Sequence, residues 1–344
     1  MRRLLLLRLS AFGDQIHAAP VVADLLHRFP GLRLDWAVDE RFADVPRRVA
    51  GVHRVIALPL KRWQRAPFAR ETRRDVAAAL RALRAERYDV ALDAQGLWKS
   101  ALVARLAHAR LRIGFVPAQC GEAGAARFYD RHIELPRGVH GVDRVRALAA
   151  RALDTDPSGP PDFGLRPAAT DAFGTEPVAV LVHGASKDDK LWPEESWVEL
   201  GRHLVARGLR PVLPAGSEAE QARAERLARA IGQDRCILPP QRPLSWWIDA
   251  LGGAALVAGV DTGFTHLAAA LGVPVVAIFT STSPGLFRPA RPQVARVLGG
   301  DGARPAAAAA IAAVDALHRP GHREAPPARR RSIDAIDDPH RPAP

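Results

Sequence analysis

Short apolar segments alternate with longer segments of helical periodicity along this 344-residue chain, in two successive blocks. Apolar runs that are separated by helices predict a parallel sheet, whose strands are joined by helical crossovers. In the first block the expected strands are residues 4–9, 32–38, 54–60, 88–94, 112–115 and 132–135, and the expected helices include 15–28 and 72–86.

A segment dense in proline and glycine, 154–177, interrupts the alternation and is predicted to be a linker. The second block gives expected strands at 178–183, 211–214, 236–238, 255–260 and 273–279, and expected helices at 194–207, 218–231, 244–251 and 265–271. We therefore expect an α/β fold with two Rossmann-like domains, 1–165 and 166–317, whose parallel sheets face a central cleft. An alanine-rich stretch from about 302 is predicted to be one packing helix, and the Pro-rich, charged tail, 318–344, is predicted to be disordered.

The first residues resemble the start of a secretion signal, because two arginines precede a run of leucines. Arg8 interrupts that run, whereas a signal core requires about 7–15 uninterrupted apolar residues, so a buried first strand is the better interpretation. No apolar stretch approaches the roughly 20 residues that span a bilayer. The two cysteines, Cys120 and Cys236, have no metal-ligand spacing, and the expected setting is the reduced cytoplasm.

Positive charge is concentrated in the first half of the chain. Residues 1–165 contain 28 Lys and Arg against 18 Asp and Glu, whereas residues 166–317 contain 15 of each. This division predicts an anionic partner for the N-terminal half, although an arginine-rich surface without a function is the plainer alternative. The aromatic content is 6% and no nucleic-acid-binding motif is present, so an anionic lipid or sugar is favoured over nucleic acid.

The segment "VAGVDTGFTHLAAAL", 257–271, places Asp261-Thr262-Gly263 between an expected strand and an expected helix. Glycine allows a ligand to approach the backbone, and the N-terminus of a helix attracts phosphate oxygens. His266 falls in the first turn of that helix, within reach of the same anion. The alternative is that Asp261 or Thr265 merely caps the helix.

Two further strand ends of the second block carry charged residues. In "HGASKDDKLWPEESW", 183–197, a lysine after the strand can balance the charge of a diphosphate leaving group, with a solvated charge cluster as the alternative. In "LPAGSEAE", 213–220, Glu218 and Glu220 are placed where a carboxylate can bind ribose hydroxyls, but acids also favour a helix N-terminus.

Asp14 directly follows Gly13 after the first expected strand, facing the expected cleft. A capping role is the simplest explanation, but a carboxylate at this point can also deprotonate an acceptor hydroxyl. The turn contains one glycine, so the dinucleotide fingerprint is absent and a dehydrogenase is disfavoured.

Basic residues also surround aromatic ones elsewhere in the N-terminal half. The segment "LKRWQRAPFARETRR", 60–74, places six basic residues around Trp63 and Phe68, and "DAQGLWKSALVARLA", 93–107, places Lys99 at another strand end. Arginine binds carboxylates and phosphates in a bidentate manner, and tryptophan suits a lipid headgroup region. Solvated faces and core aromatics are the alternative.

Taken in order, seven segments between residue 1 and about 290 resemble the ADP-heptose:lipopolysaccharide heptosyltransferases, glycosyltransferase family nine. They are "SAFGDQIHAAP", "DWAVDERFADVP", "LKRWQRAPF", "DAQGLWKSALVARLAH", "HGASKDDKLWPEESW", "LPAGSEAE" and "VDTGFTHLAAAL". The resemblance implies a GT-B fold and inverting transfer that needs neither a metal nor a resident cofactor. It also implies ADP-L-glycero-β-D-manno-heptose as the co-substrate.

The resemblance further implies that the acceptor is a Kdo sugar of Kdo2-lipid A and that the enzyme works peripherally on the cytoplasmic face of the inner membrane. A different core acceptor, as for heptosyltransferase II, is one alternative, and a nucleotide- or nucleic-acid-binding protein without transferase activity is another.

The resemblance assigns Asp14 as the catalytic base and Lys190 as the residue that balances the departing ADP. It implies donor-binding residues Ser186, Lys190, Glu220, Asp261, Thr262, Gly263 and His266. The candidates for acceptor binding are Ser10, Lys61, Arg62, Arg65, Lys99, His140 and Arg144, and no metal ligand is expected. Ala185 and Arg242 depart from the family's pattern, which puts donor contacts at those two positions in question.

Overall fold

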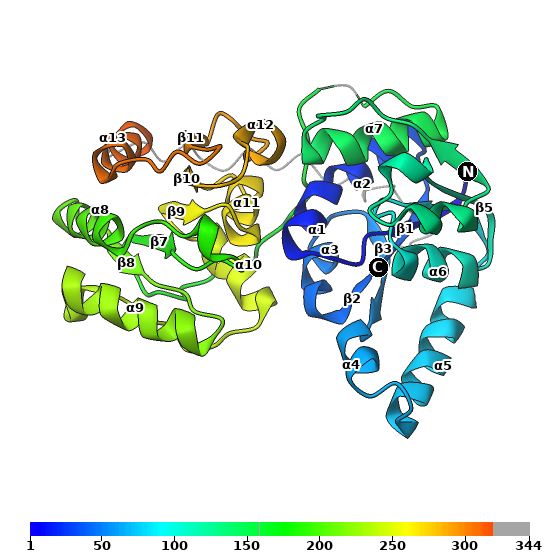
Figure 1. Ribbon diagram of the computed structural model, residues 1–344, viewed down its shortest axis with the longest axis horizontal. Helices are drawn as coiled ribbons and strands as arrows, with labels where there is room; N and C mark the ends of the chain where they lie inside the picture. Colours follow the sequence, from blue (N-terminus) through cyan, green and yellow to red (C-terminus); the bar gives the residue numbers. More distant parts are fainter. Residues whose placement is uncertain (158, 319–344) are drawn as a thin grey trace, which may run out of the picture.

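The computed structural model describes residues 1–157 and 159–318, which form two α/β domains with a parallel sheet each (Figure 1). The N-terminal sheet has the strand order β3-β2-β1-β4-β5-β6. Its strands are β1 (Arg3–Leu7), β2 (Arg33–Asp39), β3 (Val52–Leu58), β4 (Tyr88–Asp93), β5 (Ala109–Phe115) and β6 (Arg131–Ile133). Leu4 to Leu7 of β1 are all buried, as expected for a central strand that helices cover on both faces.

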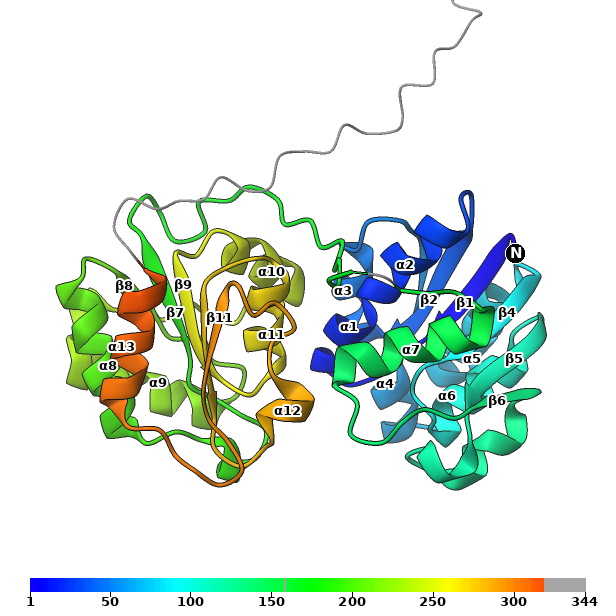
Figure 2. The same ribbon diagram turned by 90° about the horizontal axis from the view of Figure 1, so that it is seen from above.

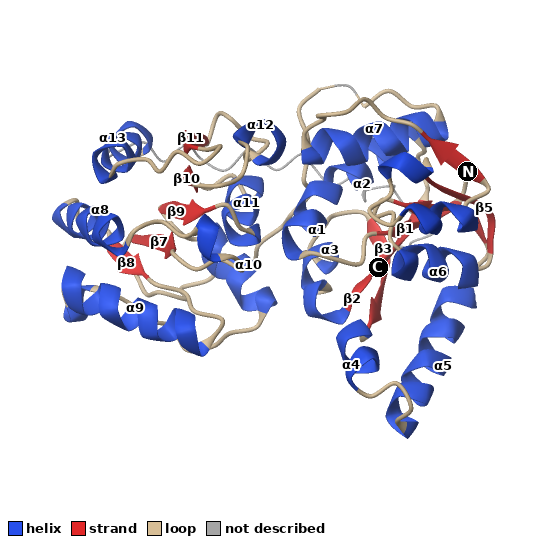
Figure 3. Cartoon of the chain, in the orientation of Figure 1, coloured by secondary structure: helices blue, strands red, loops and turns tan. Residues whose placement is uncertain are grey.

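The helices of the N-terminal domain lie on both sides of this sheet (Figure 3). They are α1 (Phe12–Ala18), α2 (Pro20–Arg28), α3 (Asp44–Arg47), α4 (Leu60–Arg65), α5 (Arg70–Arg84), α6 (Trp98–Leu106) and α7 (Gly141–Leu153). Every strand pair of the sheet is parallel, so the carboxyl ends of its strands meet at one edge. Ligand sites of open α/β sheets form at that edge.

The C-terminal sheet has the order β11-β10-β9-β7-β8 and is also parallel. Its strands are β7 (Val178–Val182), β8 (Arg210–Val212), β9 (Leu256–Val260), β10 (Val275–Phe279) and β11 (Ala295–Gly299). Its helices are α8 (Glu194–Ala206), α9 (Glu218–Ile231), α10 (Leu244–Gly252), α11 (Gly263–Ala270), α12 (Pro284–Phe287) and α13 (Ala307–Leu317). Strands β7, β9 and β10 are buried along their whole length, and the buried Trp192 packs edge-on against Trp197 of α8.

The chain crosses between the domains near residue 166. Leu165 pairs with Val49 and the Arg166 N–H donates to the Arg48 carbonyl, both within the N-terminal domain. Two residues later, the Ala168 N–H donates to Asp249 of α10 at 2.7 Å. The two domains face each other through α1 and α11, and again through α3 and α10 (Figure 2).

Several expected elements differ from the structure. The expected strand at 236–238 is wrong, because Ile237 makes only an isolated bridge to Val212. The expected helix 15–28 is two helices, since Pro20 has no N–H to donate and begins a new helix. The edge strand β11 was not expected, and the alanine-rich helix begins at Ala307 rather than near 302. The predicted tail lies outside the described residues, except for His318.

Candidate active site between the two domains

Asp261 is the centre of a network at the carboxyl end of β9. It is buried, and its Oδ2 accepts from Lys190 Nζ at 2.7 Å and from the Thr282 hydroxyl at 2.8 Å, while Oδ1 lies 3.0 Å from His266 Nε2. Burial opposes ionisation, but the bonds from His266 and Lys190 outweigh it and hold the pKa of the Asp261 carboxyl well below its usual range. The site therefore contains a fixed carboxylate that positions one lysine and one histidine.

The N-terminus of α11 lies beside this network. Thr262 is the residue before the helix and makes no capping bond, and its Oγ1 is buried without a partner among the described residues. Gly263 follows at the first position of the eight-residue helix. Free backbone N–H groups, a hydroxyl without a partner, the Lys190 ammonium group and the His266 ring form an arrangement suited to binding a phosphate group.

The loop after β10 also belongs to this site and was not among the predicted residues. Besides Thr282, Thr280 donates to the Asp189 carbonyl at 2.7 Å and so ties this loop to the Lys190 loop. The Ser281 hydroxyl is buried without a partner among the described residues. The available signal was the run of four hydroxyl residues, 280–283, directly after an apolar strand and before Pro284.

Glu220 stands at the first turn of α9, and one of its carboxylate oxygens accepts from the Gly216 N–H at 2.6 Å. The same side chain packs against Gly184, where an added Cβ would overlap it. The glycine at residue 184 thus leaves room for the Glu220 carboxylate between the loops after β7 and β8. Ser186 is exposed in the β7 loop, and Arg242 lies over the Trp246 ring, 5.5 Å from its centroid.

On the N-terminal side, Asp14 lies in the first turn of α1. Its Oδ1 pairs with Arg8 at 2.8 Å, its Oδ2 accepts from the Ala11 N–H at 2.8 Å, and 37% of the side chain is exposed. Asp14 therefore caps α1 and at the same time presents an accessible carboxylate. Arg8 was not predicted as a site residue, although its interruption of the leucine run singled it out.

The start of α1 touches the start of α11 across the domain boundary. A Cβ added at Gly13 would lie 3.6 Å from Gly263 Cα and 3.9 Å from the His266 ring. The Phe12 ring packs edge-on against Phe264 at 5.4 Å. One turn further along α1, the buried His17 ring lies 5.0 Å from that of His266.

Burial and the neighbouring His266 hold the pKa of His17 well below its usual range. His17 is therefore neutral at physiological pH. Nothing in the sequence distinguished it from an ordinary core histidine.

The predicted acceptor residues fall into two groups. Ser10 Oγ accepts from Lys99 Nζ at 2.6 Å and from the amide nitrogen of Gln95 at 2.8 Å, which joins the loops after β1 and β4. Arg144 lies over the Phe115 ring and donates to the Gln119 carbonyl. These residues line the strand-end edge that also carries Asp14.

The second group consists of His140, whose ring lies 6.1 Å from that of His17, and of three residues on α4. His140 bonds to the Arg288 carbonyl of the other domain at 2.7 Å. Lys61, Arg62 and Arg65 are exposed on α4, and Arg62 pairs with Glu40 and Asp75.

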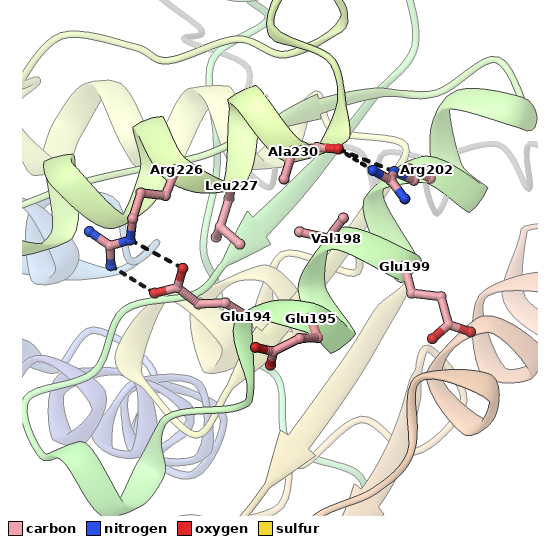
Figure 4. A pocket seen from close by; sticks show the side chains of 8 residues that line it. All are labelled: Glu194, Glu195, Val198, Glu199, Arg202, Arg226, Leu227 and Ala230. Atoms are coloured by element: carbon pink, nitrogen blue, oxygen red, sulfur yellow. Dashed lines mark hydrogen bonds and ion pairs between the residues drawn. The ribbon is translucent and has the colours of Figure 1, made fainter.

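A groove lies apart from this site, between α8 and α9 (Figure 4). Glu194 and Arg226 face each other across it and form an ion pair at 2.7 Å, so their charges satisfy one another. The groove contains no residue from a strand end. Within residues 1–157 and 159–318, no cluster of His, Cys, Asp or Glu is arranged to hold a metal, and no helix is both long and apolar enough to cross a membrane.

The fold is similar to those of solved heptosyltransferase structures. The structure matches that of "E. coli heptosyltransferase WaaC with ADP" with a TM-score of 0.83 and 34% identity, covering 92% of this chain and 100% of that one. It matches "E. coli heptosyltransferase WaaC with ADP-2-deoxy-2-fluoro heptose" with a TM-score of 0.80 and 33% identity, again over 92% and 100% of the two chains. The protein has the GT-B fold of glycosyltransferases.

The sequence comparisons define the family. Residues 76–309 match the model of glycosyltransferase family 9 (heptosyltransferase). The chain is 38% identical to lipopolysaccharide heptosyltransferase 1 of Salmonella typhimurium over 289 residues, which are 83% of this chain and 90% of that protein. The chain belongs to glycosyltransferase family 9 and is a heptosyltransferase.

Proposed function

We propose that this enzyme transfers L-glycero-D-manno-heptose from ADP-heptose to a Kdo sugar of Kdo2-lipid A, with inversion at the anomeric carbon. The observation that supports this best is the direct contact between the helix that carries Asp14 and the helix that begins at Gly263. The N-terminal domain thus contributes the Asp14 carboxylate, and the C-terminal domain contributes a helix N-terminus suited to binding phosphate. Both lie in the same region between the domains. The similarity to a named heptosyltransferase 1 along most of the chain agrees with this choice of donor and acceptor.

The diphosphate of the donor would bind at the N-terminus of α11. Thr262 and the backbone N–H groups at Gly263 would donate to its oxygens, Lys190 would contribute positive charge, and the His266 ring would lie beside them. Glu220, at the mouth of the β8 loop, would accept from the ribose hydroxyls, with Ser186 nearby in sequence on the β7 loop. No resident cofactor or metal takes part in this scheme.

In the transfer step, a Kdo hydroxyl attacks the anomeric carbon of the heptose while its proton passes to Asp14. The new carbon–oxygen bond forms as the bond to the diphosphate breaks, and ADP leaves with the bonding electrons. Arg8 and the Ala11 N–H hold the Asp14 carboxylate in one orientation for this proton transfer. Lys190 balances the negative charge that appears on the leaving diphosphate.

The acceptor is an anion, and the N-terminal edge is positively charged. Lys99 on α6, which donates to Ser10, and Arg144 on α7, which lies over Phe115, would bind the carboxylate or phosphate groups of the acceptor. Lys61, Arg62, Arg65 and His140 extend the same charge outward. Because this acceptor is a lipid, the enzyme would work at the cytoplasmic face of the inner membrane.

The test is incubation of the purified protein with ADP-heptose and Kdo2-lipid A. The expected product gains the mass of one heptose, and a parallel reaction with an acceptor that already carries the first heptose should give no product. Heptose transfer only to the second acceptor would replace the proposal by a heptosyltransferase II activity. Binding of nucleic acid without any transfer would reject it altogether.

Donor binding can be tested separately with Lys190→Met, which keeps the length of the side chain but removes its charge. Loss of a charged donor to the diphosphate should weaken ADP binding about tenfold or more by calorimetry. Lys187→Met is the matched control, since Lys187 is exposed in the same loop. Equal ADP affinities of Lys190→Met and the wild-type enzyme would contradict the phosphate role.

A further inference from the structure

The connection between α4 and α5, residues 66–69, presents an apolar ring to water at the far end of the N-terminal domain (Figure 1). Phe68 is 90% exposed, more than any other large apolar side chain of the described residues. The turn is nevertheless well defined: the Thr72 hydroxyl and the Ala69 N–H both donate to the Ala66 carbonyl, at 2.7 and 3.2 Å. Hydrogen bonds therefore fix the backbone of this turn, and the fixed turn holds the Phe68 ring in water.

Positive charge surrounds this ring. Residues 60–74 contain six Lys and Arg and a single acid, Glu71. Arg62 pairs with Glu40 and Asp75. The other five are exposed and form no ion pair with any described residue: Lys61, Arg65, Arg70, Arg73 and Arg74. Their charge is available to an external anion.

The topology places this tip at the same edge as the active site. Helix α4 begins two residues after β3 ends, Asp14 follows β1, and Lys99 follows β4. Because these strands are parallel, all three segments leave the sheet at its carboxyl edge. A surface that meets the tip therefore lies on the side from which an acceptor approaches Asp14.

We propose that the tip formed by Phe68, Arg70, Arg73 and Arg74 docks on the surface of an anionic bilayer. The Phe68 ring enters the boundary between headgroups and acyl chains, and the three arginines pair with lipid phosphates. A nucleic acid fits less well, because base stacking requires a platform of several aromatic rings and the tip presents one. Given the proposed function, this contact holds the enzyme over the membrane while the lipid-linked sugar reaches the site.

The experiment measures co-sedimentation of the full chain with vesicles of phosphatidylcholine alone or mixed with phosphatidylglycerol. Wild-type protein should bind the mixed vesicles and lose binding as salt is raised. Phe68→Ser should weaken binding roughly tenfold, and the double variant Arg73→Gln/Arg74→Gln should weaken it about fivefold for each charge removed. The matched control is Arg229→Gln/Arg235→Gln, two exposed arginines of the C-terminal domain, which should bind as the wild type does.

Activity measurements separate docking from catalysis. With Kdo2-lipid A embedded in mixed vesicles, the tip variants should lose rate in proportion to their loss of binding. With a water-soluble acceptor from which the acyl chains have been removed, they should match the wild-type enzyme. If the wild type transfers heptose to neither acceptor but vesicle binding still depends on Phe68, the proposed function fails and the docking surface stands.

Three results would overturn the docking proposal. Unchanged vesicle binding by both tip variants would remove the tip from the membrane contact. An equal loss of rate on the soluble acceptor would make the tip part of the acceptor site instead. Efficient competition by tRNA, with a dependence on the arginines but not on Phe68, would identify a general polyanion surface.

Discussion

At the scale of single residues, the site depends on carboxylates whose surroundings differ. Asp261 is buried, and its carboxylate accepts hydrogen bonds from three side chains. Its charge therefore holds Lys190, His266 and Thr282 in place. Asp14 is partly exposed and has two donors, Arg8 and the Ala11 N–H. The buried carboxylate suits a positioning role, whereas the accessible one suits proton transfer with a substrate.

The variant Asp14→Asn tests the second role. An amide keeps an oxygen that can accept from the Ala11 N–H but cannot take a proton from the acceptor. We expect kcat to fall by about 10²–10⁴-fold with ADP-heptose affinity unchanged. Steady-state rates and ADP calorimetry measure the two quantities. Asp143→Asn, an exposed acid in the first turn of α7, is the control, and a fully active Asp14→Asn enzyme would show that another group is the base.

His183 makes the stability of the protein depend on pH. It is completely buried at the end of β7, and burial, together with the nearby Arg223 charge, lowers its pKa to about 4. The folded state therefore disfavours the proton that the unfolded state binds below its pKa of about 6.5. Stability is lost as the pH falls below about 6.5, and the loss levels off near pH 4.

Between pH 7.5 and pH 5, His183 should lower the free energy of unfolding by about 2 kcal/mol. Urea denaturation of the wild type and of His183→Gln at both pH values measures this contribution. The variant should lose less stability than the wild type between the two pH values. Equal losses would mean that the histidine is protonated in the folded state as easily as in the unfolded chain.

At the scale of elements, the contact between α1 and α11 couples the two halves of the site. Gly263 can approach the N-terminal domain because it has no side chain, and an added Cβ would overlap the ring of Phe12. Gly263, the first residue of α11, is thus also the residue on which the N-terminal domain packs.

Gly263→Ala should therefore push α1 away and reduce kcat, and Phe12→Ala in the same chain should restore part of the loss. In a double-mutant cycle on thermal stability, we expect a coupling of about 1 kcal/mol between the two positions. Gly285→Ala is a suitable control because its added Cβ would meet only a serine hydroxyl at 3.6 Å. Additive effects of Gly263→Ala and Phe12→Ala would contradict the contact.

The alternation of strands and helices predicted both sheets, since a buried parallel strand needs a continuous apolar run that is visible locally. The edge strand β11 was not predicted, because it is half-exposed and contains Arg296 and therefore lacks such an apolar run. The break between α1 and α2 occurs at Pro20, whereas the apolar periodicity continues across it and predicts one helix.

The candidate site was predictable residue by residue but not as a network. Asp261 and Lys190 each follow a buried strand, but their 2.7 Å contact joins positions 71 residues apart, and no local pattern specifies it. Thr282 and His17 were missed for the same reason, because their importance comes from the neighbours that tertiary packing brings to them.

At the scale of the whole molecule, a small set of polar bonds fixes the second contact between the domains. Arg48, at the end of α3, pairs with Asp249 of α10 at 2.6 Å, and Asp44 accepts from the Ser245 N–H at 3.0 Å. Asp249 also holds the Ala168 N–H at the point where the chain enters the C-terminal domain.

Arg48→Met should lower the free energy of unfolding by about 1–2 kcal/mol, because the half-buried Asp249 loses a charged donor. Arg47→Met, which removes an exposed pair with Asp44, should change it by less than about 0.5 kcal/mol. Chemical denaturation of the two variants gives both values. Equal effects would show that the pair across the boundary contributes no more than a surface contact.

The single passage of the described chain between the domains, close to residue 166, has an evolutionary consequence. A recombination at that point carries one complete sheet with all of its helices, so one domain can be exchanged without rebuilding the other. Selection on such hybrids would fall on the few residues that meet across the boundary, above all Phe12 and Gly263 of the paired helices.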